Sequence, residues 1–266
     1  MGRDEVQSKA LDIVNQHHRC GLAISMGVGK TRIALQHMME NFNQFSSYLV
    51  VAPKKTIMAA WRDECDKMNA THLLDHIKFT TYLSLHKQNP NEFDIVYLDE
   101  CHSLLYSHRD FLDRYTGKIL GLTGTPPVYG EKAMLVDEFC PMVYNFKVDD
   151  ATSNNILNDY RIIVHMLPLD NSRNIPKKKR DGGMWYTSEV KDYEYHTGNV
   201  DDAPTMRAKQ LASIMRMKAL QTYVSKEKYT KQLMSIIKDK CIIFANTQKQ
   251  ADKMCDYSYH SKNKNS

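Results

Sequence analysis

The sequence has no apolar stretch long enough to cross a membrane. Its longest apolar runs, such as "YLVVA" (48–52) and "IVYL" (95–98), fall far short of the roughly 20 residues that a membrane-spanning helix needs. No charged start followed by an apolar segment opens the chain, so it does not begin like a secretory leader. We therefore expect an intracellular, cytoplasmic protein without a membrane partner.

Paired cysteines are also missing, because the six cysteines include no C-x-x-C pair. Several of them lie inside apolar runs, which favours reduced, buried thiols over a zinc site or disulfides. The content of 42% hydrophobic and 25% charged residues excludes collagen-like and disordered chains. A formal net charge of +5 permits a polyanionic partner without requiring one.

Short β-branched runs alternate with helix-compatible segments along the chain. Strands are expected at 20–24, 47–52, 77–82, 93–99, 118–124, 160–167 and 240–246. Helices are expected at 4–17, 30–43, 56–68, 131–138, 204–224, 226–238 and 247–257. Continuous apolar strands joined by helices are typical of a sheet covered on both faces, so the pattern predicts an α/β fold with a mostly parallel central sheet.

The composition changes near residue 150, where the polar run "DDATSNN" begins a less regular region. Residues 1–150 are expected to form one complete lobe. Residues 151–239 would be a linker or insert with a basic loop and helices, and 240–266 the start of a second lobe with a polar tail. A single late strand and its helix cannot close another sheet, so that second lobe would be incomplete.

The stretch "SMGVGKT" (25–31) follows a predicted strand and precedes a predicted helix. It lacks the first glycine of the phosphate-loop pattern G-x-x-x-x-G-K-[ST], since Ile24 stands in that place. Backbone N–H groups and a helix N-terminus nevertheless converge on phosphate in this setting. We expect nucleotide binding by Met26, Gly27, Val28, Gly29, Lys30, Thr31 and Arg32. Lys30 would reach the β- and γ-phosphates, and the Thr31 hydroxyl would ligate magnesium.

Asp99 and Glu100 end the apolar run "IVYL". Ligands of open α/β sheets bind at the carboxyl ends of the strands, where this pair would lie. Asp99 is expected to hold Mg²⁺ and Glu100 to polarise the attacking water, with Lys30 as the third catalytic residue. The alternative is a solvated acidic turn.

Four segments together resemble a known family. "SMGVGKT", "VVAPKKTIMAAW", "LDECH" and "LTGTPP" occur in the order and approximate spacing of motifs I, Ia, II and III of superfamily 2 helicases and translocases. The loop without its first glycine and the "APKK…W" segment look most like Swi/Snf-type ATPases, restriction-enzyme translocase subunits and phage DEAD/DEAH-box helicases. "KCIIFANTQKQADKMC" resembles motif IV, so the resemblance covers 4–127 and 240–257.

The resemblance implies a RecA-like P-loop NTPase lobe that uses ATP and Mg²⁺. It also implies a nucleic-acid partner, DNA more than RNA, and a phage or bacterial source; a viral protein would work in the host cytoplasm. Gln7 is placed like the family glutamine that contacts adenine. His102, Thr123 and Thr125 resemble the residues that couple nucleotide state to the grip on nucleic acid. The plainer alternatives are a solvated Gln, a packed His and a proline turn.

Pro53, Lys54 and Lys55 match the segment with which this family contacts a nucleic-acid backbone. A solvated basic turn is the alternative. The basic run at 177–180 could likewise be a loop that contacts phosphate or a solvated loop. Asp181, with Glu189 and Lys191 on an expected strand, has the rough shape of a metal-dependent nuclease core. Such acidic–lysine coincidences are common in a chain this rich in charge.

The sequence ends before motifs V and VI, and motif VI supplies the family's arginine that reaches the γ-phosphate. We therefore expect ATP binding with weak turnover, unless a second lobe, a partner chain, or Arg109 or Arg114 of another copy supplies an arginine. Two alternatives remain open, a nucleotide-binding regulatory module without turnover and a P-loop phosphotransferase. The phosphotransferase is disfavoured because no basic lid segment is evident after the acidic pair.

Overall fold

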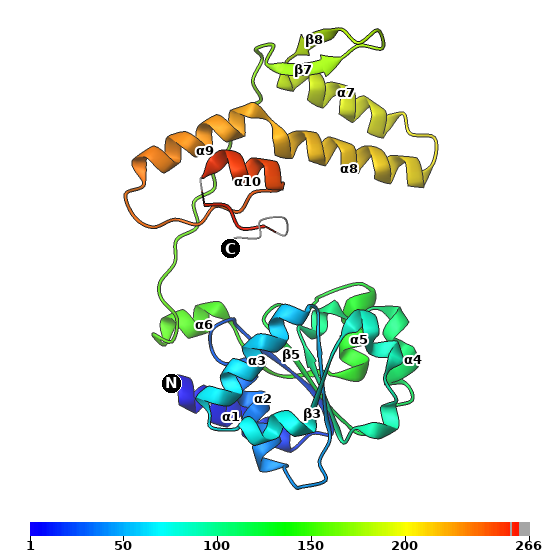
Figure 1. The fold of residues 1–266 in the computed structure, drawn as a ribbon, viewed down its shortest axis with the longest axis vertical. Helices are drawn as coiled ribbons and strands as arrows, with labels where there is room; N and C mark the ends of the chain where they lie inside the picture. The colour runs from blue at the N-terminus through cyan, green and yellow to red at the C-terminus, as the bar shows by residue number, and fades with distance from the viewer. Residues whose placement is uncertain (256, 261–266) are drawn as a thin grey trace. The chain divides into compact units, whose positions relative to one another are not determined.

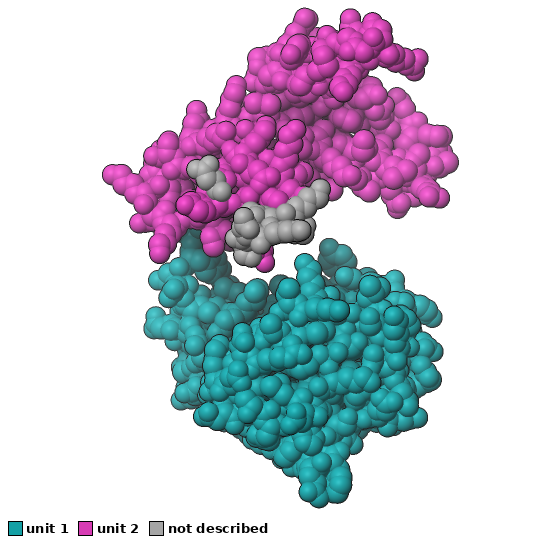
Figure 2. All heavy atoms as spheres, in the orientation of Figure 1, with its two compact units in different colours: residues 1–161 teal, residues 162–266 magenta. Residues whose placement is uncertain are grey.

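The chain forms two compact units, Met1–Arg161 and Ile162–Ser266 (Figure 1; Figure 2). The computed structural model describes residues 1–255 and 257–260, so the end of the expected polar tail, 261–266, lies outside the described residues. The expected boundary at residue 150 falls within α6 (Val148–Ser153), whose Ala151 is buried in the core of the first unit. The first unit is thus longer than the sequence suggested.

Six parallel strands form the sheet of the first unit, in the order β3-β2-β4-β5-β1-β6. They are β1 (Arg19–Ile24), β2 (Tyr48–Ala52), β3 (Ile77–Thr81), β4 (Ile95–Asp99), β5 (Lys118–Thr123) and β6 (Met142–Phe146). The first five lie where the sequence predicts strands, and β6 was not anticipated. The α/β class with a RecA-like parallel sheet is confirmed.

Helices cover both faces of this sheet (Figure 1). They are α1 (Arg3–Asn15), α2 (Lys30–Glu40) and α3 (Lys55–Lys67) on one face, and α4 (Arg109–Leu112) and α5 (Glu131–Phe139) on the other. Short 3₁₀ turns lie at Thr71–His76, Tyr82–Lys87, Pro90–Glu92, Cys101–Ser103 and Tyr106–His108. Tyr48 and Val50 of β2 pack in one core layer while Leu49 and Val51 pack in the other. Because successive side chains of a strand point to opposite faces, a strand buried on both must be apolar throughout.

Strands β4, β5 and β1 are neighbours, so their carboxyl ends meet at one edge of the sheet. Asp99 at the end of β4 lies opposite Leu122 of β5, and Thr123 lies opposite Ala23 of β1. This register brings the phosphate loop, the acidic pair and the threonine-rich turn to the same place.

The described part of the second unit contains a two-stranded antiparallel hairpin and four helices. They are β7 (Ile175–Lys178), β8 (Met184–Thr187), α7 (Glu189–Asp201), α8 (Met206–Thr222), α9 (Val224–Ile236) and α10 (Gln248–Met254). The strands expected at 160–167 and 240–246 were wrong, because the structure has none in either segment. Ile162 and Phe244 there are 77% and 93% exposed, so no described layer covers these apolar runs. No helix in the described part of the chain is both long and apolar enough to span a bilayer.

The nuclease interpretation was also wrong, because Glu189 begins helix α7 instead of lying on a strand. Its buried carboxylate accepts hydrogen bonds from the Ser225 backbone N (2.9 Å), the Ser225 hydroxyl (2.7 Å) and the Asp170 backbone N (3.0 Å). Asp181 lies in the turn of the hairpin and accepts from the Gly183 backbone N. Glu189 therefore ties α7 to the start of α9, and no group of three metal-binding side chains occurs among the described residues.

All six cysteines are free thiols, as expected. Four are buried, but Cys241 and Cys255 are exposed, against the expectation of burial. Both exposed thiols lie in the second unit, in and after the segment in which the predicted strand did not form.

Candidate nucleotide site

The loop after β1 shows why its first glycine is dispensable. Ile24 is still a strand residue, paired with Phe146 of β6 and fully buried, so a side chain is accommodated there. Gly27 and Gly29 instead have φ values of 84° and 109°, in the left-handed region that favours glycine. A Cβ at Gly29 would also lie 2.4 Å from Nε2 of Gln7. The sequence keeps glycine at the two positions whose backbone requires it.

Gln7 supports the loop from the side of helix α1. Its side chain is 3% exposed, and its Nε2 donates a 2.7 Å hydrogen bond to the carbonyl oxygen of Val28. A solvated glutamine is therefore the wrong interpretation. Its contact with adenine stays a prediction, because the structure shows only the bond to the loop.

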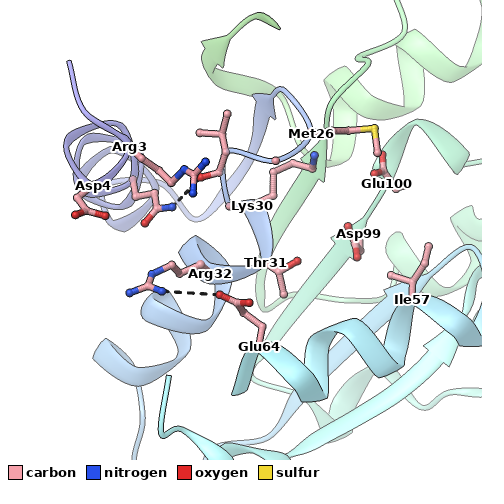
Figure 3. Close-up of a pocket in the computed structure, with 14 residues that line it drawn as sticks. Arg3, Asp4, Met26, Lys30, Thr31, Arg32, Ile57, Glu64, Asp99 and Glu100 are labelled. Atoms are coloured by element: carbon pink, nitrogen blue, oxygen red, sulfur yellow. Dashed lines mark hydrogen bonds and ion pairs between the residues drawn. The ribbon is translucent and has the colours of Figure 1, made fainter. Parts of the chain in front are cut away.

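An open pocket of about 640 Å³ lies over the loop (Figure 3). It is lined by Arg3, Asp4, Gln7, Met26, Gly27, Val28, Gly29, Lys30, Thr31, Arg32, Ile57, Glu64, Asp99 and Glu100. All the residues that the sequence assigned to nucleotide, magnesium and catalysis line this one pocket. Ile57, Glu64, Arg3 and Asp4 were not anticipated, and Glu64 lies 3.9 Å from Arg32 in an ion pair.

Lys30 is the first residue of α2, immediately after the left-handed Gly29. Its Nζ donates a 3.2 Å hydrogen bond to the carbonyl oxygen of Ile24, at the end of β1. Nζ also lies 3.5 Å from the place that a Cβ on Gly124 would take. The ammonium group thus lies at the mouth of the loop, between the ends of β1 and β5, where a phosphate would be bound.

Asp99 is held on two sides. Its side chain is nearly buried, and Oδ2 accepts a 2.8 Å hydrogen bond from the indole Nε1 of Trp61. Its backbone oxygen accepts a 3.0 Å bond from the hydroxyl of Tyr82. Burial raises the pKa of Asp99, while the Trp61 hydrogen bond and the nearby Lys30 charge lower it. Sequence reasoning missed Trp61 as a partner of the site, although a buried tryptophan closing "APKKTIMAAW" needs an acceptor for its N–H.

Glu100 adopts φ 51° and ψ 54°, a left-handed conformation that is costly for a residue with a side chain. Such strained residues cluster at functional sites. Nδ1 of His102 lies 3.3 Å from Oε2 of Glu100 and 2.9 Å from Oγ1 of Thr123. That hydroxyl in turn accepts a 3.1 Å bond from the backbone N of Thr125. The three expected coupling residues therefore form one chain of contacts that starts at Glu100.

The expected nucleic-acid residues lie apart from the pocket, after β2. Lys54 is the N-cap of α3 and Lys55 its first residue. Both lysines are exposed, and Pro53 is partly exposed. Within the described part of the chain neither lysine side chain has a hydrogen bond or ion pair. Their contact with nucleic acid stays a prediction.

Arg109 and Arg114 are both engaged within the first unit. Two nitrogens of Arg109 bond the two carboxylate oxygens of Glu138 at 2.7 and 2.6 Å, and its guanidinium lies 5.3 Å from the ring centre of Phe139. Arg114 bonds Asp110 at 2.9 Å. Donation of either arginine to another copy would require these pairs to break, and Arg109 is the more firmly held of the two.

Residues 3–128 match the family model of the res subunit of type III restriction enzymes. No curated protein matches the chain.

Solved structures similar to the chain include three helicases or ATPases. The UvsW helicase from bacteriophage T4 has 16% identity and a TM-score of 0.42, covering 51% of this chain and 57% of its own. The helicase domain of Pyrococcus furiosus Hef has 14% identity and a TM-score of 0.43, covering 56% and 39%. The Sulfolobus solfataricus SWI2/SNF2 ATPase core in complex with dsDNA has 13% identity and a TM-score of 0.42. The match covers 82% of this chain and 57% of that one. The matched region therefore spans 57%, 39% and 57% of the length of these three proteins, respectively.

The family match ends within the segment "LTGTPPV", immediately after the last of the four motifs. Everything that the structure brings to the pocket, from Arg3 to Glu100, lies inside the matched range. Over residues 3–128, the first unit of this chain is therefore similar to the res subunit of type III restriction enzymes.

Proposed function

We propose that the first unit binds ATP with Mg²⁺ and couples its hydrolysis to movement on nucleic acid, as a helicase or translocase does. The observation that carries this proposal is the chain of contacts from Glu100 through His102 to Thr123 and Thr125. A simple nucleotide-binding module needs the loop and the acidic pair. It has no use for a relay that leads from the hydrolytic residue to the neighbouring strand end.

The residues present fit a magnesium nucleotide. Mg²⁺ prefers oxygen ligands, and the Thr31 hydroxyl and the Asp99 carboxylate supply them in one pocket. Magnesium would neutralise the charge that develops on the β- and γ-phosphate oxygens. The backbone N–H groups of 27–30 and the ammonium of Lys30 would hold the phosphates. Gln7 and Arg3 lie beside the loop, on the side where we place the base.

In this assignment Glu100 orients the attacking water. Its carboxylate lines the pocket next to Asp99, and the contact with His102 fixes its position. For phosphoryl transfer the protein mainly supplies positioned charge and one oriented nucleophile. In this assignment Glu100 orients the nucleophile, and Lys30 with the loop supplies most of the positioned charge.

We propose that turnover by this chain alone is slow. Lys30 is the cation beside Asp99 and Glu100, whereas Arg3 and Arg32 lie on the other side of Lys30 in Figure 3. An arginine at the transferred phosphate is worth about 10³–10⁵ in rate. A second lobe or a partner chain would supply it. Because neither Arg3 nor Arg32 lies beside the acidic pair, the alternative of a nucleotide-binding regulatory module without turnover is also favoured.

DNA is the proposed partner, with Pro53, Lys54 and Lys55 touching its backbone. The motifs look most like those of Swi/Snf-type ATPases, restriction-enzyme translocase subunits and phage DEAD/DEAH-box helicases, and both lysine side chains are exposed. Because few cations are available to release counterions, binding should be weak and lost with added salt.

Steady-state ATP hydrolysis with and without DNA or RNA, beside equilibrium binding of ATP, tests the proposal. Magnesium-dependent binding with hydrolysis that DNA stimulates, however slowly, supports a motor lobe. Tight binding with no turnover under any condition supports the regulatory module instead. Consumption of ATP that depends on a small acceptor would identify a phosphotransferase, and absence of binding would reject a nucleotide site.

A further inference from the structure

Trp61 has an unusual place for a core aromatic residue. It lies on α3, is fully buried, and packs edge-on to Tyr97 with ring centres 6.3 Å apart. Its single polar atom, Nε1, is aimed at Oδ2 of Asp99 at 2.8 Å. A helix on the face of the sheet thus reaches the carboxylate at the end of β4, which lines the nucleotide pocket.

This hydrogen bond restricts what the carboxylate can do. Asp99 is 5% exposed, so little water competes with the indole for Oδ2. The Tyr82 hydroxyl fixes the backbone oxygen of the same residue from the other side of the sheet. With main chain and one carboxylate oxygen both held, the carboxylate cannot rotate freely about its last torsion. Its orientation toward the pocket is set before any ligand arrives.

We propose that Trp61 is a positioning residue for magnesium, which orients the Asp99 carboxylate through its indole N–H. The inference rests on the proposed function, because it assumes that Asp99 is the metal-binding carboxylate. Partners that orient a metal ligand in this way typically change metal affinity 10–100-fold when removed. We expect a loss within that range on deletion of the N–H alone.

Shape and hydrogen bonding of Trp61 can be separated experimentally. The chain has two tryptophans, and Trp185 lies half exposed on β8, far from the pocket in sequence and in the other unit. In a Trp185→Phe background, Trp61 can be replaced by 3-benzothienylalanine, which keeps the ring shape and has sulfur in place of the N–H. Trp61→Phe is the genetic counterpart, and Trp185→Phe alone is the matched control.

Binding of a fluorescent ATP analogue, titrated with magnesium and repeated in EDTA, gives the result without relying on turnover. We expect the magnesium concentration for half-maximal binding to rise about 10–100-fold in both Trp61 replacements. Metal-free affinity for the analogue and the thermal unfolding midpoint of the benzothienyl protein should stay at the control values. The control itself should keep the magnesium dependence of the unaltered chain.

The outcomes distinguish this inference from the function beneath it. An unchanged magnesium requirement in the benzothienyl protein overturns the positioning role and leaves the nucleotide site standing. Equal losses of affinity with and without metal also overturn it, because they show a structural role only. If the Trp61-containing control shows no magnesium-dependent binding, the proposed function fails and the inference fails with it.

Discussion

Lys30 should separate nucleotide binding from folding. Among the residues that the structure describes, its ammonium group bonds only a carbonyl oxygen at the loop mouth, and Lys30 packs in neither core layer. Lys30→Ala removes a charged donor to phosphate, worth about 1.5–3 kcal/mol or roughly 10–150-fold in affinity. Calorimetric titration of the variant with MgATP measures the loss of binding, and a thermal melt of the same variant shows whether folding is unchanged. Full affinity in the variant would reject the phosphate-loop assignment.

Glu100 should matter for turnover and little for binding. Glu100→Gln keeps the size of the side chain and its place beside His102 but removes the carboxylate that would orient water. We expect unchanged affinity for MgATP and hydrolysis slowed by about 10²–10⁴, the effect of lost acid–base assistance. Single-turnover hydrolysis measures it. An unchanged rate of hydrolysis would show that another residue orients the attacking water.

At the scale of residues, the sequence predicted most of the residues that line the pocket and missed the contacts that support them. Gly27, Gly29 and Asp99 follow from a motif whose spacing is fixed by the phosphate itself. Trp61 and the bond from Gln7 to Val28 do not, because they depend on which helix packs over which strand end. Each lies far from its partner along the chain, so no local pattern reports it.

Helix α2 and strand β4 are joined by a buried histidine. Nδ1 of His37 lies 2.7 Å from the hydroxyl of Tyr97, and its Nε2 is buried without a partner among the described residues. Burial lowers the pKa of His37 from 6.5 to about 4. The folded state therefore excludes a proton that the unfolded chain accepts below pH 6.5.

Stability should thus fall as the pH drops from about 6.5 to about 4, by up to roughly 3 kcal/mol from this group. Above that window His37 is neutral in both states, and below it both states are protonated. Urea unfolding of the unaltered chain and of His37→Leu, across this pH range, measures the difference in slope. If the free energy of unfolding changed with pH equally in both proteins, the pKa of His37 would be the same in the folded and unfolded states.

At the scale of elements, apolar runs were a good guide only where a layer covers them. "YLVVA" and "IVYL" became strands because helices pack on both faces of the sheet. The runs at 160–167 and 240–246 are also rich in apolar residues, yet their apolar side chains lie largely exposed. Strand propensity needs neighbouring strands to pair with, and a sequence does not show which runs have them.

At the scale of the whole molecule, the first unit should fold by itself. Both core layers are built from residues of Met1–Arg161 alone. A fragment 1–161 should therefore show a cooperative thermal transition and the same affinity for MgATP as residues 1–266. Circular dichroism and calorimetry test this. A fragment that melts without cooperativity would show that the second unit completes the fold.

The boundary between the units was the least predictable feature. The change of composition near 150 is real, but α6 and the turn after it still pack against α1. The amine of Met1 bonds Asn154 at 2.9 Å, and Arg3 bonds the carbonyl oxygen of Ile156 at 3.1 Å. Leu157 lies within 3.0 Å of the position that a Cβ on Gly27 would take. These contacts join the two ends of the first unit beside the phosphate loop, and a polar sequence does not reveal them.

Helix α3 carries exposed lysines at its start and Trp61 about 9 Å further along, at 1.5 Å per residue. A shift of this helix would move both together. If DNA at Lys54 and Lys55 tightens the hold on magnesium nucleotide by some factor, thermodynamic linkage requires the nucleotide to tighten DNA binding by the same factor. Affinities for DNA measured with and without MgATP, and for MgATP with and without DNA, must then give equal ratios above one. Ratios of one would mean that DNA binding at the start of α3 and binding of the magnesium nucleotide are not coupled.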